Sequence, residues 1–163
     1  IPVSQFRPTH MGRHLEQAKR WIETGGYADI TTGGNAARNM ATLASTLDDE
    51  SWNRVTMSSD SNGSMPKWNE KKEIVGMDRG RMTALLQTIR ELVEEYQFSV
   101  EKALLPCTAT VAQALRLKGI GIIEPGNSAD FVVLDTWKVE TVLCRGQFLA
   151  KDGTIVRKGM FEE

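Results

Sequence analysis

The fold is decided by residues 27–59, YADITTGGNAARNMATLASTLDDESWNRVTMSS. Residues 27–32 alternate in character as a β-strand does, and the breaker Gly33-Gly34 follows them. The alanine-rich run from Asn35 to Leu47 predicts a helix with Asn35 as its N-cap. Residues 54–59 predict a second strand. A strand, a helix and a strand in this order are typical of a parallel α/β sheet.

The same alternation continues on both sides of this stretch. Upstream, residues 3–7 predict a strand that ends at Pro8, and residues 14–24 predict a helix that ends at two glycines. Downstream, residues 60–79 are rich in Ser, Asn and Gly and predict a long polar loop, of a length that is often functional. An apolar stripe then predicts a helix over 81–96, and two shorter helices follow it, over 100–105 and up to Leu117.

Beyond Gly119 the sequence changes to short apolar runs separated by turn residues. The strands predicted there are 120–123, 131–134, 141–144 and 154–157, which indicate an antiparallel tail. Three β/α units do not close a sheet around a core, whereas a complete (β/α)₈ TIM barrel takes about 250 residues. We therefore expect an α/β protein in which residues 1–118 are the C-terminal part of such a barrel and residues 119–163 form a β tail.

Composition excludes several classes of partner. The chain is 40% apolar and 25% charged with a net charge of −1, which gives no electrostatic basis for binding nucleic acid or an anionic membrane. Its apolar runs are too short to cross a bilayer. Cys107 and Cys144 lie far apart without metal-ligand spacing, so we expect both to be reduced and buried in a cytoplasmic protein.

Two polar residues follow predicted strands, at the ends where barrel enzymes place their reactive groups. His10 follows the strand at 3–7, and Asp60 follows the strand at 54–59. Taken singly, such a histidine is more often an ordinary packed side chain, and such an aspartate more often forms a turn. Together at one face of a predicted barrel they indicate a metal site. Asp60 is then also the expected catalytic residue, which accepts a proton from the attacking water and passes it to a departing amine.

Two further residues are candidates for binding a substrate. Arg13 lies three residues after His10 and could form a bidentate pair with a substrate carboxylate. The alternative is a solvated arginine at the start of a helix. Ser64 follows Gly63 and could donate a hydrogen bond to the same substrate.

These residues carry a resemblance to a known family. The tail GIIEPGNSADFVVL at 121–134 is similar to that of the amidohydrolase superfamily in general. The runs PTHMGR at 8–13 and SSDSNGS at 58–64 are more specific, and they resemble the isoaspartyl dipeptidase family within it, also called β-aspartyl peptidases. The resemblance covers essentially the whole chain.

The resemblance implies a metallopeptidase that hydrolyses β-aspartyl dipeptides at a binuclear zinc site. It assigns His10 as a ligand of one zinc, Asp60 as both ligand and proton shuttle, and Arg13 and Ser64 as dipeptide-binding residues. The other ligands, a His-x-His pair, a further histidine and a carbamylated lysine, have no counterpart in this chain. The resemblance therefore implies an N-terminal half of the same enzyme as partner, a homo-oligomer, and a tail that completes a small β-sandwich domain.

Two alternatives stay open at this point. One is another amidohydrolase of the dihydroorotase, hydantoinase or deacetylase type, which would share the tail and the His/Asp chemistry. Arg13 and Ser64 at their spacings favour the dipeptidase. The other is a non-catalytic fragment or binding module. Because the chain begins at Ile1 and lacks most of the implied ligands, we expect it to be inactive alone and ordered only beside an N-terminal complement.

Overall fold

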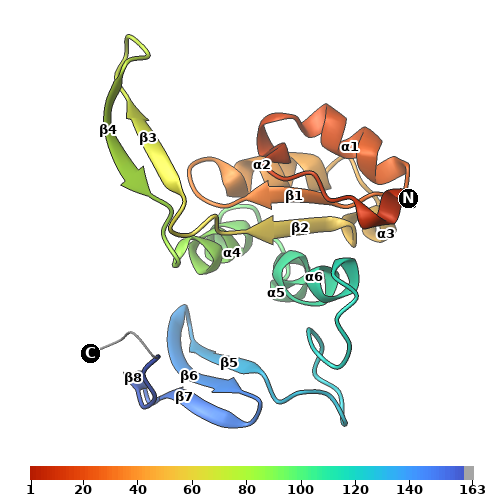
Figure 1. Cartoon of the computed structure of the whole chain (residues 1–163). Helices are drawn as coiled ribbons and strands as arrows, with labels where there is room; N and C mark the ends of the chain where they lie inside the picture. The colour runs from red at the N-terminus through yellow and green to blue at the C-terminus, as the bar shows by residue number, and fades with distance from the viewer. Residues whose placement is uncertain (160–163) are drawn as a thin grey trace. The chain divides into compact units, whose positions relative to one another are not determined.

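Two parallel strands form the centre of the first half of the chain (Figure 1). Strands β1 (Ala28–Thr31) and β2 (Val55–Ser58) pair in register, with Ala28 opposite Val55 and Thr31 opposite Ser58. The chain between them forms helices α2 (Ala36–Ala44) and α3 (Asp49–Trp52). The strand–helix–strand order predicted from residues 27–59 is therefore confirmed, and the protein is α/β.

The β1–β2 pair has one apolar and one polar face. Its buried apolar side chains are Ala28, Ile30, Val55 and Met57. Because successive side chains alternate across a strand and the register pairs residues of like kind, Asp29, Thr31, Thr56 and Ser58 share the opposite face. The strand pair thus carries hydroxyls and a carboxylate on the side away from its apolar packing.

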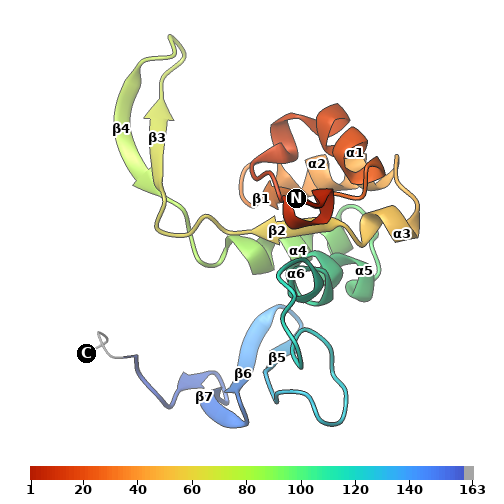
Figure 2. The same cartoon turned by 45° about the vertical axis from the view of Figure 1, so that its right-hand side comes forward.

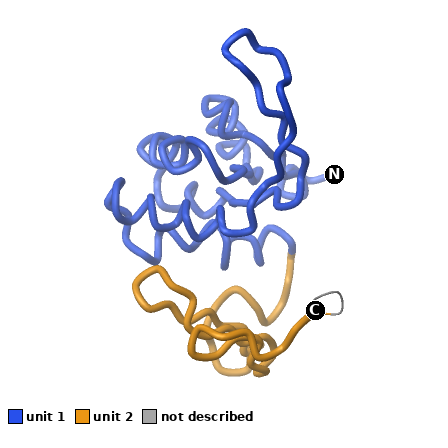
Figure 3. Tube along the Cα trace, turned by 90° about the vertical axis from the view of Figure 1, so that its left-hand side faces the viewer, with its two compact units in different colours: residues 1–115 blue, residues 116–163 orange. Residues whose placement is uncertain are grey.

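The computed structural model describes residues 1–159, and these fall into two units, one of residues 1–115 and one that starts at Arg116 (Figure 3). The remaining helices of the first unit are η1 (Val3–Gln5), η2 (Met11–Arg13), α1 (Leu15–Glu23), α4 (Ala84–Glu94), α5 (Val100–Leu104), η3 (Leu105–Cys107) and α6 (Ala109–Ala114). Ser99 caps α5 by accepting a hydrogen bond from the Lys102 amide at 3.2 Å. No helix within residues 1–159 has the length and apolar character needed to span a membrane.

The first predicted strand is wrong. Residues 3–5 form a 3₁₀-helix instead, and a backbone bond joins the following residues to the sheet edge, where the Asp29 amide donates to the Pro8 carbonyl at 2.9 Å. Proline has no amide hydrogen, so Pro8 can accept from β1 but cannot donate into a ladder. The segment therefore runs beside β1 without forming a strand.

Trp52, the last residue of α3, packs this helix against the segment that contains α5. Its side chain is buried, and its indole nitrogen donates to the Lys102 carbonyl at 3.1 Å. Its ring meets Phe98 edge-on with centroids 5.7 Å apart. One aromatic side chain thus ties the end of α3 to the start of α5.

The predicted loop over 60–79 is also wrong, because most of it forms a hairpin (Figure 2). Strands β3 (Ser64–Trp68) and β4 (Ile74–Arg79) pair antiparallel, with Ser64 opposite Arg79. Pro66 faces Met77 and Trp68 faces Ile74, which makes one side of the hairpin apolar. On the other side Lys67 and Asp78 form an ion pair at 3.0 Å. The hydrogen bond from the Arg79 backbone amide, together with Lys67, lowers the pKa of the Asp78 carboxyl.

The second unit holds one antiparallel sheet in the order β5 (Phe131–Asp135), β6 (Lys138–Cys144), β7 (Gln147–Lys151) and β8 (Thr154–Ile155). Strand β7 was not expected, and the predicted strand at 120–123 is irregular, with a bend at residues 121–122. Both cysteines are free thiols, but Cys144 is exposed, against the expectation of burial. Burial raises the pKa of the Cys107 thiol to about 11.

A buried carboxylate joins the three segments of the polar face. Asp29 is only 4% exposed, and Thr56 donates to its Oδ1 at 2.7 Å. Its Oδ2 accepts from Ser58 at 2.5 Å and from Thr9 at 3.2 Å. Within residues 1–159 no cation forms an ion pair with Asp29, so hydroxyl donors take the place of a counter-ion.

We expect Asp29→Ala to lower the free energy of unfolding by on the order of 3 kcal/mol, because it leaves buried hydroxyl donors without an acceptor. Asp29→Asn keeps the size but replaces one acceptor oxygen with a donor, so its loss should be smaller. Urea denaturation of the purified protein measures both. Asp49→Asn is the matched control, since the Asp49 side chain is 97% exposed. Equal midpoints for Asp29→Ala and the control would contradict the stabilising role.

Candidate active site

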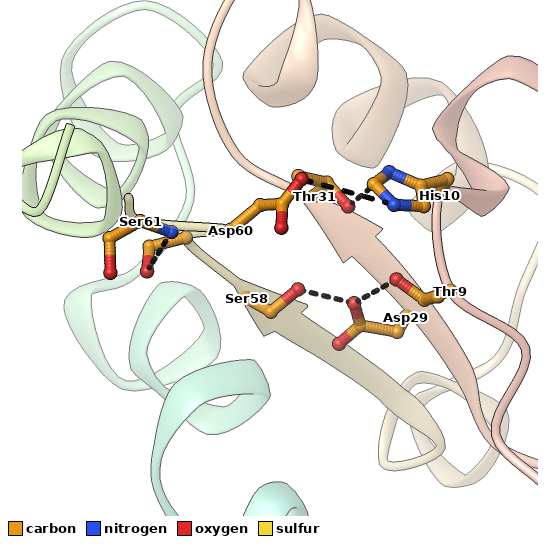
Figure 4. Close-up of polar contacts among 8 residues, drawn as sticks. Thr9, His10, Asp29, Thr31, Ser58, Asp60 and Ser61 are labelled. Carbon is orange, nitrogen blue, oxygen red and sulfur yellow. Dashed lines mark hydrogen bonds and ion pairs between the residues drawn. The ribbon is translucent and has the colours of Figure 1, made fainter. Parts of the chain in front are cut away.

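His10 lies beside the carboxyl end of β1 (Figure 4). Its backbone adopts the left-handed conformation, with φ 58° and ψ 24°, immediately before η2. Its Nδ1 is 2.9 Å from the hydroxyl oxygen of Thr31, the last residue of β1. This bond leaves the other ring nitrogen, Nε2, free to face outward from the strand end.

Asp60 lies just past the end of β2 and turns back toward His10. It too has a left-handed backbone, with φ 48°, a conformation that Asp, Asn and His adopt more readily than other non-glycine residues. One carboxylate oxygen lies 3.9 Å from His10 Nε2. The structure thus brings together two residues fifty positions apart in the sequence (Figure 4). Asp60 follows a strand as expected, whereas the strand expected before His10 does not form.

The chemistry of this pair suits a divalent metal. When Nδ1 carries the proton and donates it to Thr31, Nε2 presents a lone pair on the side of Asp60, and a hydrogen-bonded second nitrogen is usual for metal-binding histidines. Two ligands of one tetrahedral zinc lie about 3.4 Å apart. The observed 3.9 Å is slightly wider, and both side chains, 60% and 48% exposed, have room to rotate.

The described residues do not complete a metal site. A structural or catalytic zinc takes at least three protein ligands. Nowhere in residues 1–159 do three or more His, Cys, Asp or Glu side chains gather in a way that could hold a metal. His14, the second histidine of the chain, is exposed and precedes α1, without a hydrogen bond that caps the helix. The pair is therefore part of a ligand set at most.

The structure places the two candidate substrate-binding residues on separate elements. Arg13 ends η2, is exposed, and its guanidinium has no hydrogen bond or ion pair to the rest of residues 1–159. Ser64 starts β3, is also exposed, and lies opposite Arg79. Across the described chain, no hydrogen bond or ion pair joins either residue to His10 or Asp60.

Sequence reasoning missed Asp29, which accepts hydrogen bonds from residues next to both candidate ligands (Figure 4). Thr9 and Ser58, two of its hydrogen-bond donors, lie one residue before His10 and two residues before Asp60. A usable signal was present: an acidic residue in the middle of a buried strand, with hydroxyl residues at two alternate positions of the next strand. Asp29 thus holds the end of β2, from which Asp60 follows, and the residue before His10 against β1.

The chain is similar to solved structures of a β-aspartyl dipeptidase. The β-aspartyl dipeptidase of the thermophilic, keratin-degrading Fervidobacterium islandicum AW-1, in complex with β-Asp-Leu dipeptide, is 29% identical with a TM-score of 0.85. A second structure of that enzyme is 26% identical with a TM-score of 0.81. The matches cover 98% of this chain but only 43% and 41% of the enzyme, so the chain spans about two fifths of its relative.

A more distant match shows the fold alone. The N-acetylglucosamine-6-phosphate deacetylase of Pasteurella multocida is 14% identical, with a TM-score of 0.60 over 80% of this chain. The sequence model of the amidohydrolase family matches residues 14–159, a range that includes Asp60 and Ser64 and starts one residue after Arg13. This match covers most of the chain, and it shows that the chain belongs to the amidohydrolase family.

Proposed function

We propose that this chain supplies part of the active site of a metal-dependent enzyme that hydrolyses β-aspartyl dipeptides. The observation that carries the proposal is the His10–Asp60 pair, which two separate segments bring within 3.9 Å at the carboxyl ends of neighbouring strands. The similarity to a β-aspartyl dipeptidase along 98% of the chain supports the substrate class. The activity belongs to the longer enzyme, with this chain inactive alone.

The proposed architecture is a (β/α)₈ barrel with a small β-sandwich. Residues 1–118 would supply the last β/α units, and residues 119–163 would supply strands of the sandwich. In support, β1 and β2 are parallel and are joined through helices, as barrel strands are. Among the described residues these two strands pair with no third strand, so the proposed N-terminal half would contribute their neighbours.

In this proposal His10 and Asp60 hold one of two zinc ions, and the N-terminal half provides the other ligands, including a carbamylated lysine. When bound, the metal would supply Lewis-acid polarisation of the scissile carbonyl and would lower the pKa of the attacking water. Asp60 accepts the proton of that water at its carboxylate and donates it to the departing amine. The bond between His10 Nδ1 and Thr31 keeps Nε2 directed at Asp60 throughout.

Arg13 and Ser64 would recognise the dipeptide. A β-aspartyl substrate keeps a free α-carboxylate beside the reacting carbonyl. Arg13 is exposed, and its guanidinium makes no ion pair with the rest of residues 1–159, so it is available for such an anion. Ser64 lies four residues beyond Asp60 and would donate a hydrogen bond to the same substrate. The cytoplasmic location and the homo-oligomer expected from the sequence stay predictions.

A substrate panel on the full-length enzyme tests the reaction itself. We expect cleavage of β-Asp-Leu and other β-aspartyl dipeptides, with α-Asp-Leu slower by at least about 100-fold, because the α-linked isomer moves the free carboxylate away from its binding group. Dihydroorotate and hydantoin serve as the competing substrates. Opening of either ring without cleavage of any β-aspartyl dipeptide would refute the proposal in favour of another amidohydrolase activity.

The two histidines of the chain offer a matched pair for testing the metal assignment. His10→Ala should reduce the zinc content of the purified enzyme, measured by plasma mass spectrometry, and abolish most of its activity. Asp60→Asn should lower kcat by about 10²- to 10⁴-fold through loss of the proton acceptor. His14→Ala is the control and should change neither quantity. A His10→Ala enzyme with the full zinc content would show that His10 is not a ligand.

The role of Arg13 can be tested with a substrate analogue in which the α-carboxylate is a carboxamide. The wild-type enzyme should discriminate against this analogue by about 10- to 100-fold in kcat/KM, the worth of a charge-assisted hydrogen bond. Arg13→Ala should lose the discrimination, whereas Arg20→Ala, another exposed arginine, should keep it. If Arg13→Ala discriminates as well as the wild type, a different residue reads the carboxylate.

A further inference from the structure

The β3–β4 hairpin begins and ends at the candidate catalytic residue. The chain passes Asp60 two residues after the end of β2, enters β3 at Ser64, and leaves β4 after Arg79, next to Gly80. Figure 2 shows the hairpin that β3 and β4 form. Most of the hairpin is exposed, and its tip lies at residues 69–73. Its base is the only part that touches the segment around Asp60 through hydrogen bonds within the described chain.

Backbone hydrogen bonds close this base tightly. The Asn62 amide donates to the Gly80 carbonyl at 3.1 Å, and the Gly80 amide donates to the Gly63 carbonyl at 3.0 Å. The Gly63 amide in turn donates to the carbonyl of Asp60, also at 3.0 Å. Gly80 is therefore linked to Asp60 through a short chain of bonds that involves no side chain.

The two glycines of the base lie in direct contact with Asp60. A Cβ atom placed on Gly80 would overlap the Asp60 carbonyl oxygen, and would lie 3.0 Å from the Asp60 carbonyl carbon. A Cβ atom on Gly63 would lie 2.9 Å from that oxygen and 3.0 Å from the carboxylate oxygen Oδ1. By contrast, a Cβ atom on Gly76, in the middle of β4, would meet nothing within 4 Å.

Neither glycine is needed for its backbone conformation. Gly63, Gly76 and Gly80 all have φ values outside the left-handed region, so alanine could adopt the local backbone at each position. What Gly80 and Gly63 provide is space for the backbone and carboxylate of Asp60. Asp60 itself has φ 48°, a conformation that costs free energy and persists only where the surroundings impose it.

We propose that the base of the hairpin is a positioning device for Asp60, and that Gly80 is its central positioning residue. The closed base holds Asp60 in the left-handed conformation that directs its carboxylate to His10 Nε2. The remainder of the hairpin is not required for this task. The inference rests on the proposed function, because the orientation of Asp60 matters only if Asp60 is the metal ligand and proton acceptor.

The test compares Gly80→Ala with Gly76→Ala in the full-length enzyme. Gly80→Ala should displace the Asp60 backbone, and so lower both the zinc affinity, measured by competition with a chromophoric chelator, and kcat for β-Asp-Leu by about 10- to 100-fold. KM should stay within about twofold, because Arg13 and Ser64 are unchanged and substrate binding is largely separate from the proton transfer. Gly76→Ala should leave zinc affinity, kcat and KM at wild-type values.

A second variant keeps the inference testable if Gly80→Ala does not fold. Gly63→Ala presses on the carboxylate as well as the carbonyl of Asp60 and should lower zinc affinity and kcat in the same direction. Wild-type zinc affinity and kcat in a folded Gly80→Ala or Gly63→Ala enzyme would overturn the positioning role. Asp60→Asn distinguishes a failure of the proposed function from a failure of the positioning role. If that variant stays active the proposed function fails, whereas an inactive Asp60→Asn beside an unaffected Gly80→Ala refutes the positioning role alone.

Discussion

The arrangement of the first unit depends on one buried group, the carboxylate of Asp29. It accepts hydroxyl hydrogen bonds from Thr9, Thr56 and Ser58, and so joins the segment before η2 to both parallel strands. A carboxylate that lies 4% exposed without a cation is tolerated only when donors satisfy its oxygens, and hydroxyls can do so without bringing a second charge into the interior. The geometry that results fixes where β1 and β2 end.

Two short segments that lie near Asp29 carry the candidate ligands, and the side chains of these ligands are exposed. His10 is held to β1 by Thr31, and Asp60 is held by the hairpin base, while the two side chains remain 60% and 48% exposed. The backbones of the pair are thus more constrained than their functional atoms. A site of this kind can accept further ligands from another segment without rearrangement of the strands that carry it.

Much of the first unit could be predicted because burial leaves a periodic pattern in the sequence. Residues 27–32 and 54–59 show it, and so does the helix over 81–96, whereas the hairpin does not, because nearly all of its side chains are exposed and Pro66 interrupts its alternation. The strand expected at 3–7 does not form, because a segment becomes a strand only where a neighbouring strand can pair with it. Asp60 was found from its position after a strand, and His10 from a strand that does not form. Asp29 was missed, since its hydroxyl donors come from two separate segments and only the fold brings them together.

The hairpin has a consequence for how the chain can vary. Its base is closed by backbone bonds among residues 60, 62, 63 and 80. Its tip at residues 69–73 is a turn held by its own hydrogen bonds, including two from backbone amides to Asn69 Oδ1. Insertions are tolerated best where a loop tip is exposed and its backbone bonds are local. The length and sequence of the tip can therefore change without disturbing the geometry at Asp60. The same turn is the natural place to insert an epitope or a fluorophore.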